Sequence, residues 1–191
     1  MDFSGKSTII YNIDVAMPGV FKCQKKFLTP IDIIENLRGV WLPPKVWKPL
    51  LQENIREDIT NYQYNGLVLQ DTLWIIKYIA TKLEKNSPED YEEIEQLQQL
   101  LWRYPDMDSF YLTTTIEERI RRFDARESSG GKISGSDKML LGAEVFERTE
   151  NYYKNIILSR FPNTRIIDTV GATPEQTAKD IMQDKYFLRD V

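Results

Sequence analysis

The stretch Met1-Asp2-Phe3-Ser4-Gly5-Lys6-Ser7-Thr8, followed by the apolar pair Ile9-Ile10, decides the fold. It matches the second half of the phosphate-binding loop pattern Gly-x-x-x-x-Gly-Lys-[Ser/Thr]. In such a loop, glycine lets the backbone curl so that successive N–H groups face phosphate oxygens, and the following helix adds the positive end of its dipole. The sequence therefore predicts a phosphate-binding turn at the start of a helix.

The polar residues of this loop have expected roles. Lys6 would place a compact positive charge on the β- and γ-phosphates of ATP, and the Ser7 hydroxyl would ligate Mg²⁺. The nucleotide-binding residues that we expect are Asp2, Ser4, Gly5, Lys6, Ser7 and Thr8. The alternative is that this short match is an ordinary helix start. The apolar helix behind it, at the head of a strand–helix pattern, favours the phosphate loop.

The pattern is incomplete at its amino-terminal side. Its first glycine would lie one position before Met1, and the buried strand that leads into such a loop would lie before that. We therefore expect the chain as numbered to lack its first strand, and the natural chain to start upstream or this form to be impaired.

Composition restricts the other classes of function. The chain has 191 residues, a net charge of −4, no histidine and a single cysteine, Cys23. These counts exclude a catalytic triad with histidine, a cysteine-rich zinc site and an internal disulfide framework. The net charge argues against binding of a nucleic-acid polymer. No apolar run is long enough to span a membrane, and no signal peptide is recognisable, so we expect a cytoplasmic protein.

Strand and helix signals alternate along the chain. The expected strands are short apolar runs at residues 66–70, 109–112 and 165–168, with a weaker one at 20–23. Capping boxes at Thr115–Glu118 and Thr173–Gln176 predict two helix starts. This order predicts an α/β fold, in which helices flank a parallel β-sheet and ligands gather at the carboxyl ends of the strands.

In this order the motifs resemble the thymidylate kinase and deoxynucleoside kinase group of P-loop kinases. The resemblance rests on the loop Asp2–Thr8, the strand that ends in Asp71, the strand before Thr113, the helix of residues 117–122, and the last strand and helix at 166–177. It implies one kinase domain over residues 1–191. That domain would transfer the γ-phosphoryl group of ATP, with Mg²⁺, to a nucleoside or nucleoside monophosphate.

The resemblance also assigns catalytic roles, to Lys6, Asp71, Arg122 and Arg126. Asp71 would orient the acceptor, and the two arginines would close over the transferring phosphoryl group from a lid at about residues 119–138. Arg119, Arg122 and Arg126 share one helical face, since they are three and four residues apart. The glycine- and serine-rich segment of residues 127–137 reads as a mobile loop. A solvated basic stripe is the alternative for the arginines.

One departure from the family leaves the acceptor open. Thr72 stands after Asp71, where the family carries an arginine that would hold an acceptor phosphate. Two alternatives follow: a P-loop kinase that acts on another small hydroxyl compound, and a nucleotide-binding protein with little catalysis. Family members are commonly dimers, and the apolar helix of residues 72–83 is the candidate interface.

Overall fold

A computed structural model describes residues 5–24, 49, 52–53, 55–56, 59, 67–70, 73–130, 142–184 and 187. The predicted site residues Asp2, Ser4 and Asp71 lie outside these residues, as does the part of the predicted lid after residue 130. The described elements are helices α1 (Lys6–Ala16), α4 (Trp74–Lys85), α5 (Tyr91–Leu101), α6 (Ile116–Ser128), α8 (Ala143–Arg160) and α9 (Pro174–Gln183). With them are strands β1 (Phe21–Gln24), β2 (Leu67–Gln70), β3 (Phe110–Thr113) and β4 (Arg165–Asp168), and the short 3₁₀ turn η1 (Pro88–Asp90).

The strands form parallel pairs, as the alternation of strand and helix signals predicts. β1 pairs with β2 so that Phe21 lies opposite Leu67, and β3 pairs with β4 so that Phe110 lies opposite Arg165. Among the described residues, β2 and β3 are not hydrogen-bonded to one another. The prediction of an α/β fold with a parallel sheet is confirmed.

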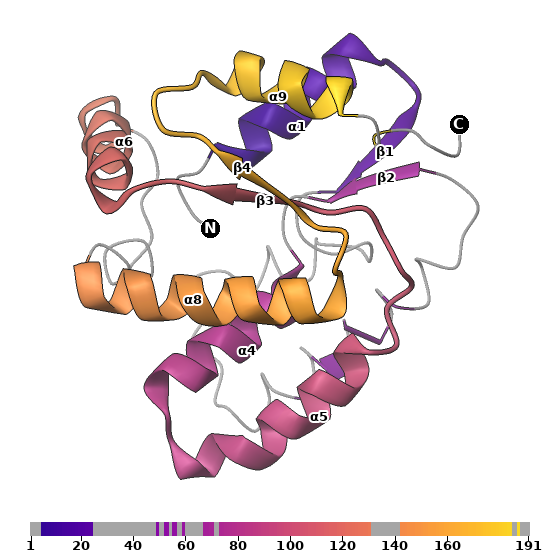
Figure 1. The fold of residues 1–191 in the computed structure, drawn as a ribbon, viewed down its shortest axis with the longest axis vertical. Helices are drawn as coiled ribbons and strands as arrows, with labels where there is room; N and C mark the ends of the chain where they lie inside the picture. Colours follow the sequence, from indigo (N-terminus) through magenta and orange to yellow (C-terminus); the bar gives the residue numbers. More distant parts are fainter. Residues whose placement is uncertain are drawn as a thin grey trace.

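Helices cover the strands from both sides (Figure 1). On one side lie α1 and α9, whose buried residues Ile9, Ile13 and Ile181 pack against Leu112 of β3 and the half-buried Leu69 of β2. On the other side α4, α5 and α8 form a larger apolar core, which contains Ile157 of α8 and also includes Tyr111 of β3. β3 therefore contributes alternate residues to the two cores, as a strand covered on both faces does.

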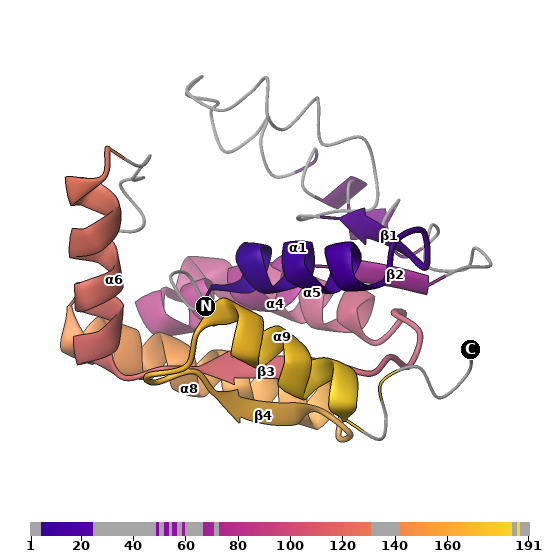
Figure 2. The ribbon, with the colours of Figure 1, turned by 90° about the horizontal axis from the view of Figure 1, so that it is seen from above.

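Helix α6 lies apart from both layers. It follows β3 after two residues and projects from the end of the strands, as the view from above shows (Figure 2). The Thr115 side chain caps its start by accepting a hydrogen bond from the Glu118 N–H at 3.3 Å. Residues 124–130, at its outer end, are all exposed. The helix is thus attached at its first two turns and exposed at its last.

The apolar face of α4 has a partner inside this chain. Ile75, Ile76, Ile79 and Ala80 are wholly buried, in the core that α4 shares with α5 and α8. These side chains are therefore not exposed to a second copy, and the homodimer stays a prediction. None of the described helices combines the length and apolarity that crossing a membrane requires.

Candidate active site

The amino-terminal end of α1 has the features of an anion site. Gly5 adopts a left-handed conformation, with φ of 85°, and its carbonyl accepts the first helical hydrogen bond from the Ile9 N–H at 3.0 Å. No side chain of the described residues caps this helix, and its first turn contains no acidic residue. The amide groups of the first turn and the helix dipole therefore favour a negatively charged ligand.

The backbone conformation of residue 5 favours glycine, whereas the space around it would admit a side chain. A Cβ atom there would lie 3.8 Å from Cδ1 of Ile9 and 3.9 Å from Cγ of Pro174, which are ordinary contacts. The positive φ is what other residues adopt only with strain. The Pro174 contact also shows that the start of α1 lies beside the start of α9. Ser7 and Thr8 are exposed there, and Lys6 is half-buried.

The three arginines of α6 have three different environments. Arg119 is wholly buried, and its guanidinium lies 5.0 Å from the centre of the Phe146 ring of α8. Arg122 is largely buried and reaches the loop after β4, whereas Arg126 is exposed on the outer half of the helix. The shared helical face that the spacing predicts is therefore divided. Arg119 anchors the helix to α8, and Arg126 extends with its outer turns.

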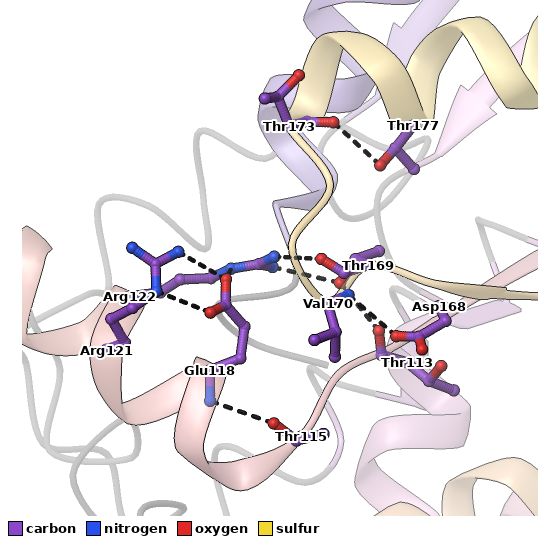
Figure 3. Close-up of polar contacts among 10 residues, drawn as sticks. All are labelled: Thr113, Thr115, Glu118, Arg121, Arg122, Asp168, Thr169, Val170, Thr173 and Thr177. Atoms are coloured by element: carbon purple, nitrogen blue, oxygen red, sulfur yellow. Dashed lines mark hydrogen bonds and ion pairs between the residues drawn. The ribbon is translucent and has the colours of Figure 1, made fainter.

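A chain of polar contacts joins α6 to the ends of β3 and β4 (Figure 3). The Glu118 carboxylate accepts hydrogen bonds from Arg121 and from Nε of Arg122, each at 2.7 Å. Arg122 continues through Nη2 to the Thr169 carbonyl at 2.6 Å. Thr169 in turn donates its N–H to the Thr113 carbonyl at 2.9 Å. Arg122 thus connects the predicted lid helix to the strand ends.

The loop of residues 169–173 lies between the two predicted halves of the site. At one end Thr169 contacts Arg122 of α6. At the other end Thr173 caps α9 by accepting a hydrogen bond from the Gln176 N–H at 3.2 Å, next to Pro174, which neighbours Gly5. The carboxylate of Asp168 accepts a hydrogen bond from the Val170 N–H at 2.9 Å and so shapes the turn between them. The structure therefore brings Gly5 and Arg122 to opposite ends of one short loop.

Below the strand ends, Tyr111 ties β3 to α8. Its hydroxyl donates a hydrogen bond to Glu150, and its ring stacks on Tyr153 with centres 5.5 Å apart. Burial, and then the negative charge of Glu150, raise the pKa of Tyr111, so the phenol stays protonated over the working range of pH. This contact supports the strand that leads into α6.

Acid is expected to weaken the ion pairs within α6. The hydrogen bond from Arg121, and then that from Arg122, lower the pKa of Glu118 from its ordinary 4.5 to about 2. Because the folded-state pKa is the lower one, the ionised carboxylate stabilises the fold fully above pH 4.5, and this contribution is lost as the pH falls toward 2. Glu118→Gln should be less stable than the wild type at neutral pH.

Thermal denaturation across that range, for the wild type and for Glu118→Gln, checks this expectation. The difference in melting temperature between the two proteins should shrink as the pH falls from 4.5 toward 2. A difference that stays constant over the same range would show that the Glu118 charge does not stabilise the folded chain.

Sequence reasoning missed the loop of residues 169–173 and the buried state of Arg119. A signal for the loop was present, since Thr169 directly follows the strand that ends in Asp168, at the edge where ligands of such sheets gather. No metal-binding group of three or more acidic, cysteine or histidine residues occurs among the residues that the structure describes. An exposed Ser7 hydroxyl still fits Mg²⁺, which typically takes one or two protein ligands together with substrate phosphates and water.

A known structure shares this arrangement of elements. Thymidylate kinase from Candida albicans aligns with a TM-score of 0.61 and 22% sequence identity, over 95% of this chain and 85% of that one. The chain has the fold of a thymidylate kinase-like P-loop kinase. No family model and no curated protein matches the chain at a significant level. At this identity the likeness assigns the fold, and the reaction has to be argued from the site.

Proposed function

We propose that the protein transfers the γ-phosphoryl group of ATP, with Mg²⁺, to a nucleoside or nucleoside monophosphate. The observation that carries the proposal is the start of α1, where left-handed Gly5 precedes Lys6 and Ser7 with no acidic residue in the first turn. This end of the helix lies at the same loop that Arg122 of α6 contacts from the other side. A triphosphate held at α1 would therefore have lid arginines beside it.

Each residue of the site has a proposed part in the reaction. Lys6 and the amides of the first turn bind the β- and γ-phosphates, with Asp2, Ser4 and Thr8 completing the loop. Ser7 holds Mg²⁺, which supplies charge neutralisation on the phosphates when bound. Arg122 and Arg126 stabilise the negative charge of the transferring group. Asp71, which directly follows β2, orients the acceptor.

The second candidate function changes only the acceptor. Thr72 follows Asp71, and a threonine cannot make the two-pronged hydrogen bond with which an arginine holds a phosphate. A small hydroxyl compound that is not a nucleoside and carries no phosphate would not need that arginine. With such an acceptor Asp71 would also be placed to accept the hydroxyl proton.

A panel of acceptors tests the proposal and separates the candidates. The protein is incubated with Mg²⁺ and ATP labelled on the γ-phosphate, together with nucleosides, nucleoside monophosphates or small polyols. Label in a nucleoside or nucleoside monophosphate is the expected result. Label confined to polyols would transfer the assignment to the second candidate. Binding of ATP with no transfer to any acceptor would contradict both and identify a nucleotide-binding protein.

A further inference from the structure

Thr169, in the loop after β4, makes polar contacts to both β3 and α6. Its side chain is almost completely buried, with 1% exposed. The hydroxyl donates to the Thr113 carbonyl at 2.9 Å and lies 3.3 Å from Nη1 of Arg122. Its backbone carbonyl and N–H bind Arg122 and Thr113 as well, at 2.6 Å and 2.9 Å. One residue therefore links β3, the loop after β4 and α6.

The direction of these hydrogen bonds follows from chemistry. A guanidinium has donors only, and a carbonyl oxygen has lone pairs only. The Thr169 hydroxyl proton must therefore point to the Thr113 carbonyl, which leaves an oxygen lone pair toward Nη1 of Arg122. The hydroxyl can serve both partners only in this orientation, and the carbonyl of β3 fixes it. The position of the Thr113 carbonyl at the end of β3 therefore helps to set the position of the Arg122 guanidinium.

The Arg122 guanidinium is consequently held at each of its three nitrogen atoms. Nε binds Glu118 of its own helix at 2.7 Å, and Nη1 and Nη2 bind the hydroxyl and the carbonyl of Thr169. Figure 3 shows the side chain extending from α6 to this residue. Arg126 lies four residues further on, so it shares the face of α6 that Arg122 presents. Arg122 therefore attaches this face of α6 to the loop after β4, in addition to the contact of Arg119 with α8.

We infer that Thr169 is a positioning residue for phosphoryl transfer, acting through Arg122. Its hydroxyl aligns the guanidinium with the ends of β3 and β4. The inference rests on the proposed function. Thr169 itself would contact no reacting atom. Its hydroxyl would set the position of Arg122, which is the side chain proposed to contact the transferring phosphoryl group.

Two substitutions separate the hydroxyl from the shape of the side chain. Thr169→Val keeps the volume and the backbone bonds but removes the hydroxyl, and Thr169→Ser keeps the hydroxyl. Because a hydrogen bond to a charged group is lost, Thr169→Val should lower kcat/KM for transfer about tenfold. Thr169→Ser should stay within roughly threefold of the wild type. Equal losses in the two variants would overturn the inference, because packing and not the hydroxyl would then matter.

A double-mutant cycle tests whether Thr169 acts through Arg122. In an Arg122→Gln background, Thr169→Val should produce little further loss of kcat/KM, because the group that the hydroxyl positions is already absent. Additive losses in the double variant would show that Thr169 acts by another route and would overturn the inference.

Hydrogen exchange supplies a readout that does not depend on transfer. Amides of α6 should exchange about tenfold faster in Thr169→Val than in the wild type or Thr169→Ser, while those of α9 stay unchanged. Unchanged exchange in α6 would overturn the positioning role, whether or not the protein is a kinase. If the wild type transfers no phosphate but α6 responds in this way, the proposed function fails and the contact between Thr169 and α6 stands.

Discussion

Replacing Lys6 by alanine is expected to lower kcat/KM for phosphoryl transfer by roughly a thousandfold. Lys6 is the first residue of α1, directly after the left-handed Gly5. In the proposed mechanism its ammonium group meets the phosphates that the first-turn amides would bind. Removing one group that stabilises charge in a transition state costs about a hundredfold to a thousandfold. In a P-loop the lysine also contributes to binding of the triphosphate, which adds to the loss.

Steady-state transfer of labelled phosphate measures this effect, with circular dichroism as a check that the fold is retained. Lys85→Ala is a suitable control, because it removes a lysine from an exposed position in the last turn of α4. The control should transfer phosphate at the wild-type rate. Equal rates for Lys6→Ala and the wild type would remove the phosphate loop from the mechanism.

The largest loss of stability is expected for Arg160→Ala. Arg160 ends α8 with 7% of its surface exposed, and it donates to the Leu101 carbonyl at 3.2 Å and to the Tyr104 carbonyl. Its guanidinium also binds Asp106 at 2.8 Å and lies 4.6 Å from the centre of the Phe161 ring. Truncation would remove the donor to the Tyr104 carbonyl and leave the Leu101 carbonyl with the Tyr104 N–H at 3.2 Å, in the segment between α5 and β3. We expect a loss of about 3 kcal/mol in the free energy of unfolding.

Urea denaturation of the variant, with Arg148→Ala alongside, measures that loss. Arg148 lies on the same helix and pairs with Glu84 at 3.0 Å, but its side chain is 52% exposed. Exposed pairs of this kind contribute little, so the midpoint for Arg148→Ala should stay close to that of the wild type. Equal shifts for the two variants would show that the Arg160 contacts do not hold the α5–β3 connection.

Local sequence signals predicted the elements that local chemistry determines. The two helices start where expected, since Thr115 and Thr173 accept hydrogen bonds from the N–H groups of Glu118 and Gln176. The Glu118 and Gln176 side chains bind residues further along their own helices, so the caps have the threonine half of the expected capping box. The strand predicted at residues 109–112 is found at Phe110–Thr113, a shift of one residue. These features depend on neighbours within a few positions, so the sequence contains what is needed to find them.

The different environments of the three arginines of α6 could not be predicted from local sequence signals. Spacing places Arg119, Arg122 and Arg126 on one helical face, but their environments depend on which distant segments lie beneath each turn. Arg119 meets Phe146 of α8, and Arg122 meets Thr169, a residue 47 positions further along the chain. Both contacts arise only when β3, β4 and α8 are assembled. The predicted roles of the site residues all stay predictions, and Asp2, Ser4 and Asp71 also lie outside the described part of the chain.

The most direct test of the central claim is single-turnover transfer from ATP labelled on the γ-phosphate, with Mg²⁺ and a mixture of nucleosides and nucleoside monophosphates. The wild type should produce a labelled nucleotide, and the same reaction should fail with Lys6→Ala or after chelation of Mg²⁺. A wild-type protein that binds ATP but labels no nucleoside or nucleotide, or one whose transfer survives the loss of Lys6, would contradict the account.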